Sequence, residues 1–146
     1  MLHIVKELTD EFVAYLKDDP VRPEIPAEQR VNENSRIYVL KDANNQPLAV
    51  TCVKFLAQVP ENVEQLANFT VDTSTAVFYT IWSYAGGAGR ELIVNAQASI
   101  KEEFPNIITY VTLSPKTEMA RRFHLKNGAG VYRENADTVN YIYESK

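Results

Sequence analysis

The sequence predicts an α+β domain whose β-sheet mixes parallel and antiparallel strands. Three observations predict this class. Runs rich in β-branched and aromatic residues recur along the chain, residues 75–113 have the order and length of a right-handed βαβ unit, and the end of the chain resembles a two-stranded hairpin. With 146 residues the chain has the size of one domain, and it needs no disulfide or metal to bury a core.

The N-terminal half alternates predicted strands with turns. Residues 2–8 form either a first strand or the lead into a helix over 9–17, which Thr9 can cap. The Pro-rich segment 18–26 is irregular. The sequence ANNQ, between two β-rich runs, predicts a hairpin turn. The other predicted elements of this half are strands over 36–42 and 47–57 and a short surface helix over 60–69.

The C-terminal half has the most ordered pattern. TAVFYTIWSY, residues 75–84, is nearly all β-branched or aromatic, as in a central strand covered on both faces. A helical pattern over 90–104 leads to a second buried strand over 107–113. The Ser-Pro pair at 114–115 indicates the start of a second helix, which Gly128 ends. The predicted strands of the final hairpin are residues 131–134 and 138–144.

A glycine-rich turn joins the strand over 75–84 to the helix over 90–104. Small side chains there expose backbone N–H groups at a helix N-terminus, where the helix dipole favours an anion such as a phosphate. A tight turn with close helix–sheet packing also prefers glycine, so both interpretations stay open. The turn lacks the Lys of a Walker loop and does not match the dinucleotide fingerprint. The candidate anion-binding residues are Gly86, Gly87, Ala88, Gly89 and Arg90.

Two polar residues late in the chain are candidate reactive groups. Ser114 can cap the helix that follows it, and it also ends a central strand, where the ligand crevices of α/β units lie. His124 is either a histidine near a helix end or a proton donor and acceptor. If the helix is unbroken from Pro115, the two residues are ~15 Å apart along its axis, too far for a direct hydrogen bond.

The glycine turn resembles the acyl-CoA motif of the GNAT acetyltransferase superfamily, Q/R-x-x-G-x-G/A, whose amides bind the CoA pyrophosphate. Gly87 and Gly89 match the motif, and Tyr84 occupies the Q/R position. The later sequence ARRFHLKNGA resembles the helix pattern of the same superfamily, in which a tyrosine is the general acid toward the CoA sulfur. His124 stands at the position of that tyrosine.

A second resemblance covers about residues 35–143. The segments AVFYTIWSY, IKEEFPNI, TLSP, RFHLKNGA and VNYIY are similar, in this order, to the catalytic domain of malonyl-CoA decarboxylase. The resemblance implies that Ser114 and His124 are catalytic, with Tyr143 in support, and that malonyl-CoA is converted to acetyl-CoA and CO₂. It also implies a GNAT-like fold, in which helices flank both faces of a mixed central sheet.

The sequence departs from the decarboxylase family at several places. The insertion between the LSP and RFHL motifs is reduced to KTEMAR, and Gly87 replaces an acidic residue of the active site. The family's N-terminal helical domain has no counterpart, so we predict one acyl-CoA-binding domain over 1–146. Three functions stay open: decarboxylation of malonyl-CoA, acyl transfer from CoA to an amine, and acyl-CoA binding without catalysis.

Composition and residue spacing argue against several other classes of function. The net charge of -4 argues against nucleic acid as the main partner. The single cysteine, Cys52, excludes an internal disulfide and predicts a cytoplasmic setting. No apolar run approaches the ~20 residues that span a bilayer, and no spacing of His, Cys and Asp indicates a metal. The resemblance to these families implies coenzyme A, bound as an acyl-CoA substrate, as the ligand, and the oligomeric state stays open.

Overall fold

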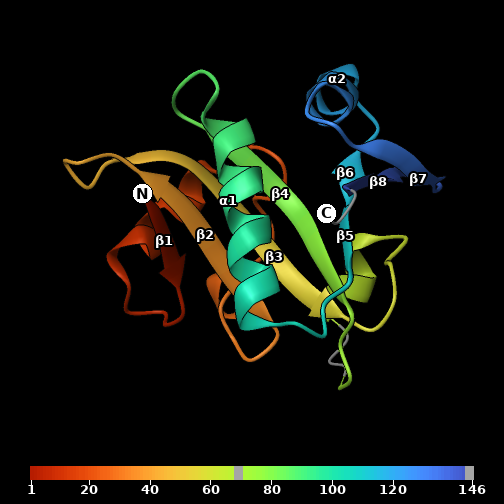
Figure 1. Ribbon diagram of the computed structural model, residues 1–146, viewed down its shortest axis with the longest axis horizontal. Helices are drawn as coiled ribbons and strands as arrows, with labels where there is room; N and C mark the ends of the chain where they lie inside the picture. Colours follow the sequence, from red (N-terminus) through yellow and green to blue (C-terminus); the bar gives the residue numbers. More distant parts are fainter. Residues whose placement is uncertain (68–70, 144–146) are drawn as a thin grey trace.

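The computed structural model describes residues 1–67 and 71–143, so the last residues of the predicted helix 60–69 and strand 138–144 lie outside the described residues. The described residues form an eight-stranded sheet of order β1-β2-β3-β4-β5-β8-β6, with β7 paired to β8 (Figure 1). The strands are β1 (Leu2–Val5), β2 (Ser35–Lys41), β3 (Pro47–Leu56), β4 (Thr75–Ser83), β5 (Thr109–Thr112), β6 (Ser114–Pro115), β7 (Gly130–Glu134) and β8 (Thr138–Tyr143).

The sheet is mixed, as the sequence predicts. β4 and β5 run parallel, because the helix α1 (Ala88–Glu103) connects them as a crossover. The other pairings between these strands are antiparallel. The predicted βαβ unit is therefore present, and it places the start of α1 just after the end of β4.

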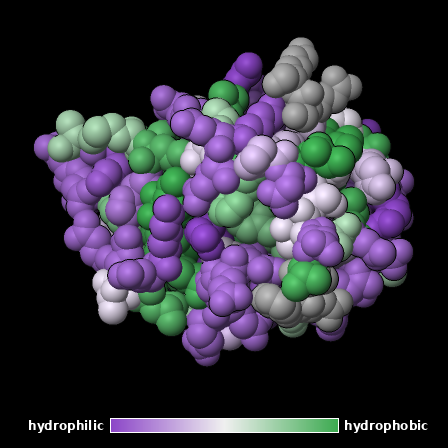
Figure 2. Space-filling view, turned by 60° about the horizontal axis from the view of Figure 1, so that its bottom comes forward, coloured by the Kyte–Doolittle hydropathy of each residue, from purple (hydrophilic) through white to green (hydrophobic). Residues whose placement is uncertain are grey.

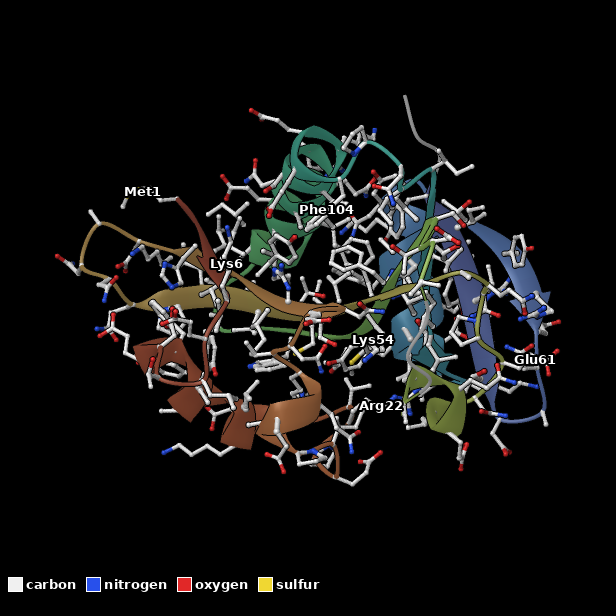
Figure 3. All side chains as sticks on the ribbon, turned by 90° about the horizontal axis from the view of Figure 1, so that it is seen from below. Met1, Lys6, Arg22, Lys54, Glu61 and Phe104 are labelled. Carbon is white, nitrogen blue, oxygen red and sulfur yellow. The ribbon has the colours of Figure 1, made fainter. Side chains whose placement is uncertain are left out.

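Helices cover both faces of the sheet, which confirms the predicted fold class. α1 packs on one face through apolar residues that are each at most 2% exposed: Leu92, Ile93, Ala96 and Ile100. The opposite face carries short 3₁₀ helices, which are η1 (Glu11–Asp18), η2 (Ala27–Gln29) and η3 (Val63–Ala67). Figure 3 views the sheet from its edge and shows α1 on one side and η1 and η2 on the other.

The first helix differs from its prediction in type and in cap. Residues Glu11–Asp18 form a 3₁₀ helix, and Asp10 caps it in place of Thr9. The Asp10 carboxylate accepts the N–H of Phe12 at 2.9 Å. The other carboxylate oxygen of Asp10 lies 2.7 Å from Nε2 of His3, so the cap also fastens η1 to β1.

The helix that follows Ser114 begins later than the sequence predicts. Ser114 does not cap it, because Ser114 pairs with β8 as part of β6. The helix α2 (Glu118–Lys126) starts three residues further on, where the Thr117 hydroxyl accepts the N–H of Ala120 at 3.2 Å. Its end agrees with the prediction: the chain turns left-handed at Gly128, with φ at 98°.

Hydrophilic side chains cover most of the face shown in Figure 2, and hydrophobic ones form patches between them. Exposed large apolar side chains such as Val71, Ile108 and Met119 come from different segments. Isolated exposure of this kind is ordinary in proteins. Within the described ranges, no helix has both the length and the apolar character that crossing a bilayer requires.

Candidate functional site

β4 and β5 separate halfway along β4. Their pairing ends near Phe78, whose carbonyl accepts the N–H of Leu113 at 3.1 Å. Tyr79 is a bulge, because its neighbours Phe78 and Thr80 pair with consecutive residues of β3. Beyond this point β6 pairs with β8 instead of β4. β4 and β6 therefore diverge toward the end of the molecule where α1 begins and α2 lies (Figure 1).

A cleft of about 360 Å³ lies where the strands diverge. The second half of β4 forms one wall, including Ile81 and Trp82, and α2 contributes Phe123 to another. Gly89 reaches the cleft from the first turn of α1, and Ser114 reaches it from β6. The lining is mainly apolar, and none of the described lining residues carries a charge. Such a cleft fits an organic ligand with a long apolar arm.

The glycine turn adjoins this cleft through Gly89. Gly87 caps α1 without a side chain and has a φ of 78°, a conformation that residues with a Cβ rarely adopt. The N–H groups of Gly89 and Arg90 have no backbone acceptor among the described residues, because the first bonds of the turn come from Ala88 and Glu91. These N–H groups and the helix dipole provide the features that an anion needs.

Gly89 also serves close packing. A Cβ at this position would lie 3.0 Å from two ring atoms of Phe123 on α2. Glycine therefore lets α2 approach the start of α1 and narrow the cleft. Both sequence interpretations of the turn, anion binding and tight packing, are compatible with this geometry. Gly86, Gly87 and Arg90 are exposed, whereas Ala88 and Gly89 are buried.

Tyr84 points away from the other candidate CoA-binding residues. Its hydroxyl donates to the Asp18 carboxylate at 2.8 Å and accepts the indole N–H of Trp82 at 3.0 Å. Its ring meets that of Tyr15 edge-on, at 6.2 Å between centroids. Asp18 and Tyr15 belong to η1, so these contacts lie on the face of the sheet opposite α1.

Ser114 is buried at the wall of the cleft and is 4% exposed. Its hydroxyl donates to the Thr112 hydroxyl oxygen at 2.8 Å. Thr112 accepts the N–H of Tyr141 at 3.1 Å, and its carbonyl accepts the amide of Asn140 at 2.8 Å. The fixed neighbours of Thr112 thus hold the Ser114 hydroxyl in place. The sequence did not single out Thr112 as a candidate, although alternation along a strand places residues 112 and 114 on the same face.

His124 and Tyr143 form a buried polar pair. Nδ1 of His124 lies 2.7 Å from the Tyr143 hydroxyl, and the imidazole stacks on Tyr141 at 5.1 Å between centroids. Burial lowers the pKa of His124 to about 4 and raises the pKa of Tyr143, so both side chains are neutral near pH 7. The imidazole tautomer decides which of the two donates the shared hydrogen.

The structure brings together two of the three predicted catalytic residues. His124 bonds Tyr143, whereas Ser114 bonds Thr112, and no hydrogen bond joins Ser114 to His124 among the described residues. Phe123 lines the cleft and His124 follows it on the inner side of α2. The later start of α2 shortens the helix between Ser114 and His124, yet the two side chains keep separate partners.

Among the described residues, no group of three or more His, Cys, Asp or Glu side chains could hold a metal ion. Cys52 is buried, and burial raises the pKa of its thiol to about 11, so the thiol stays protonated near neutral pH. The chemistry available at the cleft is therefore that of hydroxyl groups and backbone N–H groups, and the neutral His124–Tyr143 pair lies outside the described lining.

No protein-family model matches the chain, and no curated protein matches it in sequence. Its fold, however, is similar to that of solved structures. A malonyl-CoA decarboxylase from Agrobacterium vitis has a TM-score of 0.83 at 17% identity, over 100% of this chain and 60% of that one. The enzyme of the same name from Rhodopseudomonas palustris has a TM-score of 0.76 at 20% identity, over 99% and 59%.

A GNAT family acetyltransferase from Elizabethkingia anophelis, solved with acetyl-CoA bound, has a TM-score of 0.67 at 13% identity. That comparison covers 99% of this chain and 97% of the acetyltransferase. The chain thus spans about 60% of the decarboxylase chains that it matches and nearly all of the acetyltransferase. At these identities the likeness establishes the fold. The chain has the GNAT fold, in an arrangement similar to that of the malonyl-CoA decarboxylases.

Proposed function

We propose that the chain binds an acyl-CoA in the cleft between β4 and β6. One observation carries the proposal: free N–H groups at the start of α1 adjoin an apolar cleft that also contains Ser114. The pyrophosphate of CoA matches the helix start, and its pantetheine arm matches the cleft. The acetyl-CoA bound to an acetyltransferase of the same fold supports this assignment.

The activity that we propose is decarboxylation of malonyl-CoA. Loss of CO₂ breaks a carbon–carbon bond and leaves its electron pair on the carbon beside the thioester, as an enolate. The Ser114 hydroxyl lies at the cleft, where a donor to the thioester oxygen stabilises that charge. Its hydrogen then turns from Thr112 to the substrate.

A proton must finally reach the carbon, and we assign its delivery to the His124–Tyr143 pair. Because the pKa of His124 is about 4, the imidazole in the free protein is neutral near pH 7. It also lies behind Phe123, outside the described lining of the cleft. Proton delivery by His124 therefore requires α2 to shift toward the bound thioester, whereas Ser114 lines the cleft without such a shift.

Acyl transfer to an amine is the alternative activity. An amine acceptor is an ammonium ion near pH 7, and a base must remove its proton before it attacks the thioester. The described lining of the cleft contains no carboxylate and no histidine that could do so. This absence favours decarboxylation, which needs no acceptor.

Incubation of the purified protein with malonyl-CoA, without an acceptor, tests the proposal. We expect acetyl-CoA and CO₂ to form, and Ser114→Ala to abolish their formation while CoA still binds in a titration calorimeter. Ser83→Ala is the matched control, because Ser83 also lines the cleft but on β4. Binding without product would leave an acyl-CoA-binding module. If neither CoA nor acetyl-CoA binds, the proposed site is wrong.

A further inference from the structure

A tightly held bend lies beside the cleft, where η1 ends. The Asp19 carboxylate accepts the N–H of Val21 at 2.7 Å and that of Arg22 at 2.9 Å. Arg30 holds the same bend through two contacts: it donates to Asp19 at 2.7 Å and to the carbonyl of Arg22. Val21 also lines the cleft, so the bend forms part of the wall.

The ion pair that holds this bend is almost completely buried. The exposed fractions of the Arg30 and Asp19 side chains are 1% and 0%. The Thr80 hydroxyl donates to Asp19 at 2.8 Å, which ties the bend to β4. Burying two charges costs so much desolvation free energy that such a pair is weak evidence for stability. Here the pair fixes the backbone of Arg22, because Asp19 accepts its N–H and Arg30 donates to its carbonyl.

The guanidinium of Arg22 has donors that the protein does not use. Nη2 donates to the carbonyl of Leu113 at 3.1 Å, immediately before Ser114 in the chain. Nε is buried and has no hydrogen-bond partner in the described part of the chain. Within the same residues, no carboxylate lies within ion-pair distance of Arg22.

Arg22 lies on the side of the sheet opposite α1 (Figure 3). Burial lowers its pKa, and the carboxylates of Glu24 and Asp19 act in the opposite direction. An arginine remains charged near neutral pH under such shifts. The bend therefore presents a cation without a direct counter-ion, next to the peptide bond that leads to Ser114.

We propose that Arg22 determines the specificity of the cleft for the acyl group, by binding the free carboxylate of a dicarboxylic acyl-CoA such as malonyl-CoA. This inference rests on the proposed function. A guanidinium matches a carboxylate with two parallel N–H groups, and a carboxylate bound there gives Arg22 its missing counter-ion. An acetyl group gains nothing from this contact. None of the described residues that line the cleft is a cation, and Arg22 lies directly behind its wall, where Nη2 donates to the carbonyl of the lining residue Leu113.

The effect of Arg22 on KM and kcat depends on the negative charge that leaves the substrate carboxylate during decarboxylation. The carboxylate held by Arg22 is the group that leaves as CO₂, and its charge passes to the thioester oxygen. The ion pair is therefore stronger with the bound substrate than with the transition state. Loss of Arg22 therefore raises KM strongly and does not lower kcat, because the lost ion pair stabilises the bound substrate more than the transition state.

The experiment compares Arg22→Met with the control Arg122→Met, since Arg122 is an exposed residue of α2 that pairs with Glu118. Calorimetry measures the Kd of acetyl-CoA and of succinyl-CoA, which carries a carboxylate but has no malonyl group to decarboxylate. Malonyl-CoA turnover supplies KM and kcat. We expect Arg22→Met to weaken succinyl-CoA binding and raise KM ~10- to ~100-fold, as for lost hydrogen bonds to a charged group. We expect acetyl-CoA binding to change less than ~3-fold.

Each other outcome has a distinct meaning. Equal loss of affinity for both ligands would show that Arg22 only shapes the bend, and an unchanged preference in Arg22→Met would equally overturn the inference. Failure of the wild-type protein to bind acetyl-CoA would instead overturn the proposed function. If Arg22→Met does not fold, Arg22→Lys carries the test. It retains a charge but not the paired N–H groups, so the preference for succinyl-CoA must shrink.

Discussion

Acidification weakens the fold through His124, and the size of the effect can be worked out from its burial. The pKa of His124 is about 4 in the folded chain, compared with about 6.5 for an exposed histidine in the unfolded chain. As the pH falls below 6.5, His124 becomes protonated in the unfolded chain but stays neutral in the folded chain. The contribution of the neutral imidazole to stability is therefore complete above pH 6.5 and is lost as the pH falls toward 4. The loss amounts to ~2 kcal/mol between pH 8 and pH 5.

Urea unfolding of the wild type and of His124→Gln at pH 8, 6.5 and 5 measures this effect. Glutamine does not titrate, and its amide is able to hydrogen-bond Tyr143. The carboxylates titrate alike in both proteins, so the difference between their unfolding free energies isolates His124. We expect that difference to shift by ~2 kcal/mol against the wild type between pH 8 and pH 5. A difference that stays constant would refute the buried, neutral state of His124.

Two further substitutions test the walls of the cleft. Gly89→Ala pushes a Cβ against Phe123, so we expect weaker CoA binding and ~1 kcal/mol less stability, with overpacking partly offset by helix propensity. Gly86→Ala meets no atom within 4 Å and is the stability control; equal urea midpoints for the two variants would contradict the close approach of α2. Arg30→Met leaves the Asp19 carboxylate without its buried partner and is expected to cost ~3 kcal/mol, measured by urea unfolding. A cost below ~1 kcal/mol would contradict the importance of the buried pair.

The central elements of the fold could be predicted because their own sequences determine them. The strand predicted over 75–84 is β4, and the helix predicted over 90–104 is α1 with two more residues at its start. The start of α2 could not be predicted from local signals. A Ser-Pro pair is a good helix start, but pairing with Val139 of β8 places Ser114 in a strand. Partners distant in the sequence decided this boundary.

The candidate site was accessible to sequence reasoning to different degrees. Ser114 and the glycine turn follow buried strands, and ligand crevices of α/β units lie at such strand ends. The pairing of His124 with Tyr143 crosses from α2 to β8, so it could not be derived from spacing. The buried ion pair of Asp19 and Arg30 could not be predicted, because the segment between them is irregular and has no periodic pattern that would indicate a partner.

The pairs Ser114–Thr112 and His124–Tyr143 are attached to the sheet in different ways, and this difference matters for the proposed mechanism. Ser114 lines the cleft from β6 and bonds Thr112 of β5, and the N–H of Tyr141 in β8 fixes Thr112. His124 is carried by α2, a helix of nine residues that begins at the cap of Thr117. In the proposed mechanism, a shift of α2 breaks the hydrogen bond of His124 to Tyr143 and brings His124 toward the thioester, whereas the bond to Thr112 keeps the Ser114 hydroxyl in place. In the proposed decarboxylation, enolate stabilisation is thus preorganised in the sheet, while proton delivery depends on the helix.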